Sequence, residues 1–276
     1  MRHEDLLRLA ELVKGASGIE LSGAQLGSLG GALRRVDPAL EPAHLLKCAD
    51  PVRRADLLDR LVDEVTVNET YFMRHADELL SIDWPQLAAN ALAAGRRLRI
   101  WSAACSSGEE PYTLALMAAE ALGGAGAPVD VLGTDISPTT LARAQRGVYG
   151  VRSMRLVSAD HRERWFEGAD RGSLRVGDQL RGLVRFQRHN LIPDGTPPAG
   201  ETPFDLVICR NVLIYFHRDT VTRILRGLRT AVAPHGELVL GAADRLGTQD
   251  LSPARPAPAA PARRRRSSPA PARPRT

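Results

Sequence analysis

The chain has 276 residues, 43% of them hydrophobic, which is enough for one large domain or for a small and a medium one. Its three cysteines are an odd number without metal-ligand spacing, which argues against a disulfide framework and against a metal site. No apolar stretch is long enough to cross a bilayer and the N-terminus lacks a signal-peptide pattern, so we expect a soluble, cytoplasmic protein.

The net charge of +5 is concentrated at the C-terminal end of the chain. From Gly247 onward there are seven arginines and one acidic residue, so the remainder of the chain is close to neutral. Residues 248–276 repeat proline, alanine and arginine, and we expect them to be disordered. The arginines at 263–266 leave two interpretations open: a solubilising tether, which we favour, or contact with RNA, acidic lipid or an acidic partner. For the folded part we expect no nucleic-acid partner.

The residues before this tail form two regions that differ in their pattern of apolar residues. In residues 1–66 apolar side chains recur at helical spacing, which predicts a small all-α domain. A linker and connecting helix follow at 67–97. Over residues 98–247 apolar strands alternate with amphipathic helices, which predicts an α/β domain with a mainly parallel sheet. The more polar stretch at 150–190, with the strand candidates GSLRV and GLVRF, has the character of an insertion.

The stretch IWSAACSSGEEPYTLALM, residues 100–117, is a strand, a turn of small residues and a helix. This arrangement is typical of cofactor sites in doubly wound proteins. The turn has only one glycine, Gly108, and Glu109 and Glu110 would repel a phosphate, so a nicotinamide dehydrogenase is disfavoured. The carboxylates instead indicate a ligand with an ammonium group or another cation.

Asp135 ends the next predicted strand, where a carboxylate can accept hydrogen bonds from the hydroxyls of a ribose. The alternative is an ordinary helix cap beside Ser137. S-adenosylmethionine combines a ribose, an ammonium group and a positively charged sulfur. It is therefore the ligand that this pair of strand ends predicts.

Five motifs in order and spacing resemble the CheR family of chemotaxis receptor methyltransferases over roughly residues 18–246. They are NETYFMR (68–74), WSAACSSGEEPYTLA (101–115), TDIS (134–137), NL (190–191) and FDLVICRNVLIYF (204–216). The resemblance implies a helical N-terminal domain, a linker, and a Rossmann-type class I methyltransferase domain with a small inserted antiparallel β-subdomain. It also implies methylation of glutamate side chains in the cytoplasmic helical region of chemoreceptors, with S-adenosyl-L-homocysteine as the product.

The family's functional residues fall on definite positions of this sequence. The cofactor contacts that the resemblance implies are Asn68, Thr70, Arg74, Glu110, Asp135, Asn190, Leu191, Asn211 and Val212, and the catalytic candidates are Arg74 and Tyr215. Glu109 remains an alternative to Glu110. Asn68 and Thr70 have the alternative role of capping a following helix, and Arg74 that of a surface ion pair.

The implied reaction agrees with the residues that the sequence offers. A glutamate carboxylate is ionised at neutral pH, with a reference pKa of about 4.3, so its methylation needs no general base. The histidines, among them His189, are scattered, and we interpret them as surface or turn residues. Arg74 and Tyr215 are the candidates for aiming the carboxylate.

The sequence departs from the family pattern at two positions: Met73 replaces an aromatic residue, and Asp244 stands where a glutamate is expected.

Two other functions remain open: a methyltransferase of the same fold with another substrate, and a non-catalytic module that senses the cofactor and binds a partner. We expect a monomer that associates with the membrane only peripherally, through its receptors.

Overall fold

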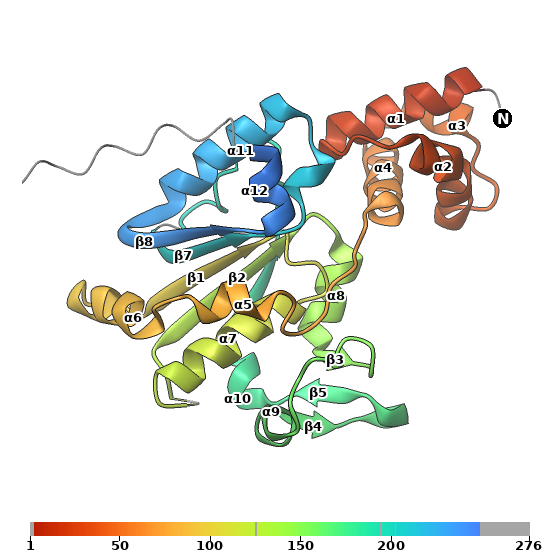
Figure 1. Cartoon of the computed structure of the whole chain (residues 1–276). Helices are drawn as coiled ribbons and strands as arrows, with labels where there is room; N and C mark the ends of the chain where they lie inside the picture. Colours follow the sequence, from red (N-terminus) through yellow and green to blue (C-terminus); the bar gives the residue numbers. More distant parts are fainter. Residues whose placement is uncertain (1–2, 125, 194, 202, 249–276) are drawn as a thin grey trace, which may run out of the picture.

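A computed structural model describes residues 3–124, 126–193, 195–201 and 203–248 of the chain. It consists of an N-terminal helical unit, a connecting segment and an α/β domain (Figure 1). The Pro/Ala/Arg-rich tail expected at 248–276 lies, apart from Thr248, outside the described residues. None of the helices in the described ranges combines the length and the apolarity that crossing a membrane requires.

The helical unit contains α1 (His3–Ser17), α2 (Gly23–Val36), α3 (Pro42–Leu46) and α4 (Pro51–Val65). Side-chain caps mark where two of these helices begin. Ser22 and Gln25 form a capping box at the start of α2, and the Asp50 side chain accepts hydrogen bonds from the first backbone amides of α4. Their apolar faces meet in one core, which includes Leu9, Leu33 and Leu61. The connecting segment carries the short helix α5 (Ala76–Leu80) and then α6 (Trp84–Ala93).

Five parallel strands form the central sheet, in the order β6-β2-β1-β7-β8. Their bounds are β1 (Leu98–Ala103), β2 (Val129–Asp135), β6 (Val184–Arg188), β7 (Phe204–Cys209) and β8 (Val232–Leu240). Helices α7 (Glu109–Ala121), α8 (Pro138–Arg146) and α11 (Arg218–Ala231) connect them, and α12 (Ala242–Thr248) follows β8. The sheet and its order confirm the predicted α/β class, since alternating strands and helices favour parallel pairing.

The two faces of the sheet have separate cores. Ile100 and Ile208 pack with α6 and α7 on one face, and Trp101 and Val207 pack with α11 on the other. Side chains that alternate along a strand point to opposite faces, so the central residues of β1 and β7 must be apolar on both faces. Gly133 in β2 allows close packing, because a Cβ atom there would lie 2.8 Å from the Phe186 ring.

A small antiparallel sheet, β3-β5-β4, lies beyond one end of the large sheet (Figure 1). It comprises β3 (Val148–Tyr149), β4 (Phe166–Gly168) and β5 (Leu174–Val176), with α9 (Ala159–Trp165) before β4 and α10 (Asp178–Arg181) after β5. The predicted strand GSLRV contains β5. The predicted strand GLVRF, however, belongs to β6, which pairs in parallel with β2 from Val131 to Asp135. Placing GLVRF in the insertion was therefore wrong.

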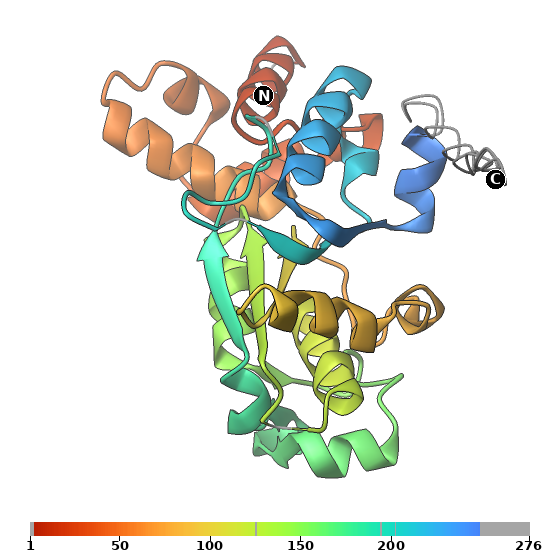
Figure 2. The same cartoon turned by 90° about the vertical axis from the view of Figure 1, so that its left-hand side faces the viewer.

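Figure 2 shows the strands of the large sheet pointing towards the helical unit. The carboxyl ends of parallel strands are where open α/β sheets bind ligands. Several contacts join the two parts at this edge, among them an ion pair of 2.8 Å between Arg188 and Asp59. The fold thus places the strand ends of β1, β2 and β7 opposite α1 and α4.

Candidate active site

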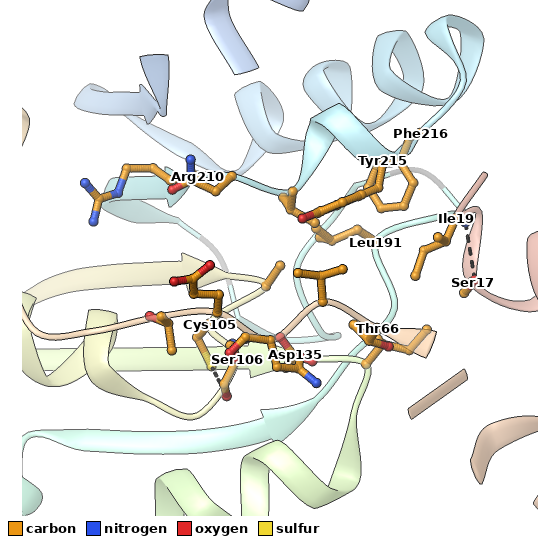
Figure 3. A pocket seen from close by; sticks show the side chains of 18 of the residues that line it. Ser17, Ile19, Thr66, Cys105, Ser106, Asp135, Leu191, Arg210, Tyr215 and Phe216 are labelled. Carbon is orange, nitrogen blue, oxygen red and sulfur yellow. Dashed lines mark hydrogen bonds between the residues drawn. The ribbon is translucent and has the colours of Figure 1, made fainter. Parts of the chain in front are cut away.

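A pocket lies between these strand ends and the helical unit (Figure 3). Every site residue expected from the sequence lines it: Asn68, Thr70, Arg74, Glu110, Asp135, Asn190, Leu191, Asn211, Val212 and Tyr215. The structure therefore brings together residues that lie up to 147 positions apart, in five separate segments of the chain.

The turn after β1 exposes its backbone to the pocket. Ala104 and Ser106 adopt positive φ angles of 62° and 50°, and Gly108 has a φ of 93°. A Cβ atom at Gly108 would lie 2.6 Å from the Cβ of Ala144, so both the angle and the space require glycine there. Non-glycine residues in this region of φ are uncommon and cluster at functional sites, where the surrounding structure maintains them.

Glu109 and Glu110 begin α7 but face different surroundings. Glu110 lines the pocket, where its Oε1 accepts a hydrogen bond of 2.7 Å from Ser102 and its Oε2 one of 2.8 Å from Arg210. Glu109 is buried outside the pocket lining and accepts from Ser107 at 2.7 Å and from Ser153 at 2.9 Å. Burial raises the pKa of Glu109. The geometry thus favours Glu110 as a ligand-facing group and Glu109 as a support for the turn.

Asp135 occupies the end of β2 and is almost completely buried. Its Oδ2 accepts from the amide of Ser106 at 2.8 Å and its Oδ1 from the amide of Ser137 at 2.9 Å. The cap of α8 is Ser137, not Asp135, so the capping alternative is wrong. Burial raises the pKa of Asp135, and the backbone hydrogen bonds oppose that shift. Each carboxylate oxygen has a second lone pair that can accept from a hydroxyl.

The segment around Asn68 and Thr70 runs along the pocket without helical structure. The Ser106 hydroxyl donates to the Asn68 carbonyl at 3.3 Å, which ties this segment to the turn after β1. The following helix, α5, begins at Ala76, after His75 in a left-handed conformation. Asn68 and Thr70 therefore do not cap a helix, contrary to the alternative considered for them.

Arg74 lines the pocket as part of a turn that ends this segment. One terminal nitrogen donates to the Glu69 carbonyl at 2.6 Å, and the guanidinium lies 5.7 Å from the centre of the Tyr71 ring. The Nε atom is buried and has no hydrogen-bond partner among the described residues. A buried donor without a partner is costly, and a carboxylate ligand would supply one.

The loop after β7 carries Asn211, Val212 and Tyr215 to the opposite side of the pocket. Figure 3 shows the Tyr215 hydroxyl pointing into the pocket, across from Asp135 and Ser106. Tyr215 ends the 3-10 helix η2 (Leu213–Tyr215). Burial raises the pKa of Tyr215, so the phenol is protonated at neutral pH and can donate a hydrogen bond.

Asn190 and Leu191 follow β6 and connect the pocket to the helical unit. The Asn190 amide donates to the Ala16 carbonyl at 2.9 Å, and its oxygen accepts from the Ile192 amide at 3.1 Å. His189 also lines the pocket and is half-buried, with its ring 2.7 Å from the Thr196 carbonyl. The interpretation of His189 as a surface or turn residue was therefore incomplete.

Sequence reasoning missed two parts of the pocket. Ser17, Ile19 and Gln25 of the helical unit line it, although no motif marked them. Arg210 was also missed, although it stands inside the motif CRNVLIY. Its side chain is 2% exposed and pairs with Glu110 at 2.8 Å and Glu78 at 3.4 Å, so it holds the ligand-facing carboxylate in place. The signal in the sequence was an arginine directly after the apolar run LVIC.

Comparisons with known proteins identify the family of this chain. The sequence profile described as CheR methyltransferase, SAM binding domain, matches residues 68–257. Chemotaxis protein methyltransferase 2 of Pseudomonas aeruginosa is 39% identical over 185 residues, covering 65% of this chain and 64% of that protein. Chemotaxis protein methyltransferase 1 of Vibrio cholerae is 37% identical over 215 residues, 74% of each chain.

Among solved structures, a TehB-like SAM-dependent methyltransferase from Corynebacterium glutamicum aligns with a TM-score of 0.32 at 19% identity, covering 60% of this chain and 73% of that one. The profile match and the Vibrio cholerae relative each extend over more than two thirds of this chain. The profile match includes the turn, the strand ends and the loop that form the pocket. The chain belongs to the CheR family of S-adenosylmethionine-dependent chemotaxis methyltransferases.

Proposed function

We propose that this protein methylates glutamate side-chain carboxylates of chemoreceptors, giving glutamate methyl esters and S-adenosylhomocysteine. The observation that carries the proposal is the convergence of Glu110, Asp135, Arg74 and Tyr215 on one pocket at the carboxyl ends of a parallel sheet. The names of the relatives, chemotaxis protein methyltransferases, supply the connection to chemotaxis. The nearly neutral folded part supports a protein substrate rather than a nucleic acid, and we propose a cytoplasmic monomer that meets the cytoplasmic helices of membrane-bound receptors.

The donor and acceptor groups of the pocket fit S-adenosylmethionine. The Asp135 oxygens can accept from ribose hydroxyls, and Glu110 can accept from an ammonium group. The buried Nε of Arg74 can donate to a carboxylate. Asn190 and Leu191 are assigned beside the adenine, Asn211 and Val212 beside the methionine portion, and Asn68 and Thr70 along the connecting segment. When bound, the cofactor supplies an electrophilic methyl group on a sulfonium.

The residues of the reacting end orient rather than activate the substrate. A glutamate carboxylate is already a nucleophile at neutral pH, since its reference pKa is about 4.3. Arg74 and the protonated phenol of Tyr215 both present donors to the pocket, and together they can hold a carboxylate in line for attack. Removal of water from that carboxylate is the remaining requirement for the reaction.

The first test of the proposal is isothermal titration of the full chain with S-adenosylhomocysteine, beside an Asp135→Ala variant. We expect binding at about micromolar affinity, with loss of about tenfold or more in the variant because the ribose hydroxyls lose a charged acceptor. Transfer of labelled methyl groups to a receptor cytoplasmic fragment is the second measurement. Binding without transfer would favour the alternative of a cofactor-sensing module, and absence of binding would overturn the cofactor assignment.

Arg74→Ala tests the catalytic assignment directly. We expect turnover to fall by about 100-fold or more with the fold intact, because the substrate carboxylate is no longer held in line. Arg155→Ala is the matched control, since Arg155 stacks on the same Tyr71 ring at 3.4 Å but does not line the pocket. Near-native receptor methylation by Arg74→Ala would contradict the assignment.

A further inference from the structure

The loop that presents Asn211 and Tyr215 has an unusual backbone. Asn211 follows β7 with a φ of 59°, in the left-handed region, and the chain then turns through η2. A non-glycine residue in this conformation persists only when its surroundings maintain it. The contacts that maintain the loop therefore also determine where the Tyr215 hydroxyl lies.

A buried carboxylate from another element supplies those contacts. Asp244, in α12, is 1% exposed. Its Oδ2 accepts a hydrogen bond from the Asn211 amide, and its Oδ1 accepts one of 2.8 Å from the Leu213 amide. A single side chain thus bonds to both ends of the turn that separates β7 from η2. Such an anion surrounded by successive main-chain amides resembles the backbone nests that bind anions in other proteins.

The space around this carboxylate is tightly defined. A Cβ atom on Gly241 would lie 2.7 Å from Asp244 Oδ2 and 3.2 Å from the Asn211 nitrogen. On the other side of α12, Arg245 pairs with Glu78 at 2.8 Å, and Glu78 pairs with Arg210. The helix is therefore linked to the same network that holds Glu110.

We propose that Asp244 is a positioning residue for methyl transfer, whose two carboxylate oxygens hold the 211–215 loop in the conformation that directs Tyr215 and Asn211 into the pocket. The proposal rests on the function proposed above. Asp244 does not line the pocket, so it acts only through the loop. A displacement of about 1 Å at the reacting end can lower a rate by about 100-fold, which makes such support kinetically visible.

The chemistry of the contact separates this role from simple filling of space. Each oxygen of Asp244 accepts from a different amide, so both must be acceptors. An asparagine has almost the same shape but would direct its NH₂ group at one amide, leaving two donors facing each other. A glutamate retains both acceptors at the cost of one extra methylene. The carboxylate, not the volume, is therefore the property to test.

The experiment compares Asp244→Asn, Asp244→Glu and Gly241→Ala with the native full chain. The control is Asp205→Asn, because Asp205 is an equally buried carboxylate at the opposite end of β7, bonded to Arg96 at 2.7 Å and to the Arg99 amide at 2.9 Å. The measurements are kcat for receptor methylation, the Kd for S-adenosylhomocysteine, the Tm, and hydrogen exchange of the amides at 211–214.

We expect Asp244→Asn and Gly241→Ala to lower kcat by about tenfold or more and to accelerate exchange at 211–214 by a similar factor, with a smaller rise in Kd. Asp244→Glu should lie between them and the native enzyme. Asp205→Asn should lower the Tm but leave kcat within about twofold, since its effect is on stability alone. This pattern would support the positioning role.

If Asp244→Asn keeps the native kcat and the native rate of hydrogen exchange at 211–214, the proposal is overturned. It is also overturned if Asp205→Asn loses as much kcat as Asp244→Asn does. If the native chain binds S-adenosylhomocysteine but transfers no methyl group, the proposed function fails while exchange at 211–214 still decides the role of Asp244. Unchanged exchange in both Asp244→Asn and Gly241→Ala would then reject it.

Discussion

At the scale of single residues, the two adjacent carboxylates at the start of α7 lie in different surroundings. Glu110 faces the pocket and pairs with Arg210, whereas Glu109 is enclosed by Ser107 and Ser153. We expect Glu110→Gln to weaken S-adenosylhomocysteine binding by about tenfold or more, because a charge-assisted bond to the ammonium group becomes a neutral one. Isothermal titration measures this directly.

Glu109→Gln is the matched control, and its effect depends on pH. Because burial raises the pKa of Glu109, the native protein loses stability as pH rises from the unfolded value of about 4.3 through the raised native pKa. A neutral glutamine avoids that loss, so we expect near-native affinity and a smaller fall in the Tm between pH 4 and pH 7 than in the native chain, as measured by thermal unfolding. A drop in affinity equal to that of Glu110→Gln would contradict the division of roles.

Sequence alone could not separate these two residues. Consecutive positions on a helix point about 100° apart, and the sequence does not show which of them faces the pocket. The answer depends on Ser153, which lies 44 positions away in the insertion. Asp135 was easier to predict, because its place at the end of a strand follows from the pattern of apolar residues alone. The role of Asp244 depends on a contact across 33 positions, which sequence pattern does not reveal.

At the scale of elements, a network of ion pairs stabilises β6, an edge strand of the large sheet. Glu201 accepts from both terminal nitrogens of Arg185 in β6, at 2.7 and 2.6 Å, and from Arg99 in β1 at 2.6 Å. The hydrogen bonds from Arg185 lower the pKa of Glu201. The stability that the pair contributes is therefore present above the unfolded pKa of about 4.3 and is lost as pH falls through the lower native pKa.

Glu201→Gln tests that network. We expect it to lower the free energy of unfolding at pH 7 by about 1 kcal/mol, with the difference from the native chain shrinking as pH falls from about 5 to about 3. Urea unfolding over a pH series measures the free energy of unfolding of both chains and the pH dependence of the difference between them. Glu64→Gln is the control, because its pair with Arg35 is exposed, with side-chain exposures of 36% and 58%, and should contribute little. A constant difference across the series would reject the electrostatic account.

The elements themselves were largely predictable, with one instructive exception. The alternation of strands and helices after residue 98 indicated the parallel sheet, because each apolar strand had to be covered on both faces. GLVRF was misplaced because β6 is an edge strand, partly exposed and preceded by polar residues, so its local pattern does not differ from that of the inserted strands. Only the register with β2 distinguishes β6 from the inserted strands, and pairing across 53 positions leaves no local signal.

At the scale of the whole molecule, the helical unit is part of the binding site. Ile19 is buried and lines the pocket, and its backbone forms an isolated β-bridge with Phe216. We expect Ile19→Ala to raise the Kd for S-adenosylhomocysteine by about three- to tenfold, in line with the loss of buried methyl groups, and to reduce the rise in Tm that the ligand causes. Leu7→Ala, on an exposed face of the same unit, should change neither value. Equal effects in the two variants would show that Ile19 acts through general stability.

One hydrogen bond joins this helical unit to the reacting end of the pocket. The Glu20 amide donates to the carbonyl of Tyr215 at 2.9 Å, so the α1–α2 connection is bonded directly to the segment that carries Tyr215. Any movement that separates the helical unit from the α/β domain must break this bond. The backbone at Tyr215 is therefore supported from both parts of the chain, and the pocket has its described shape only while they are in contact.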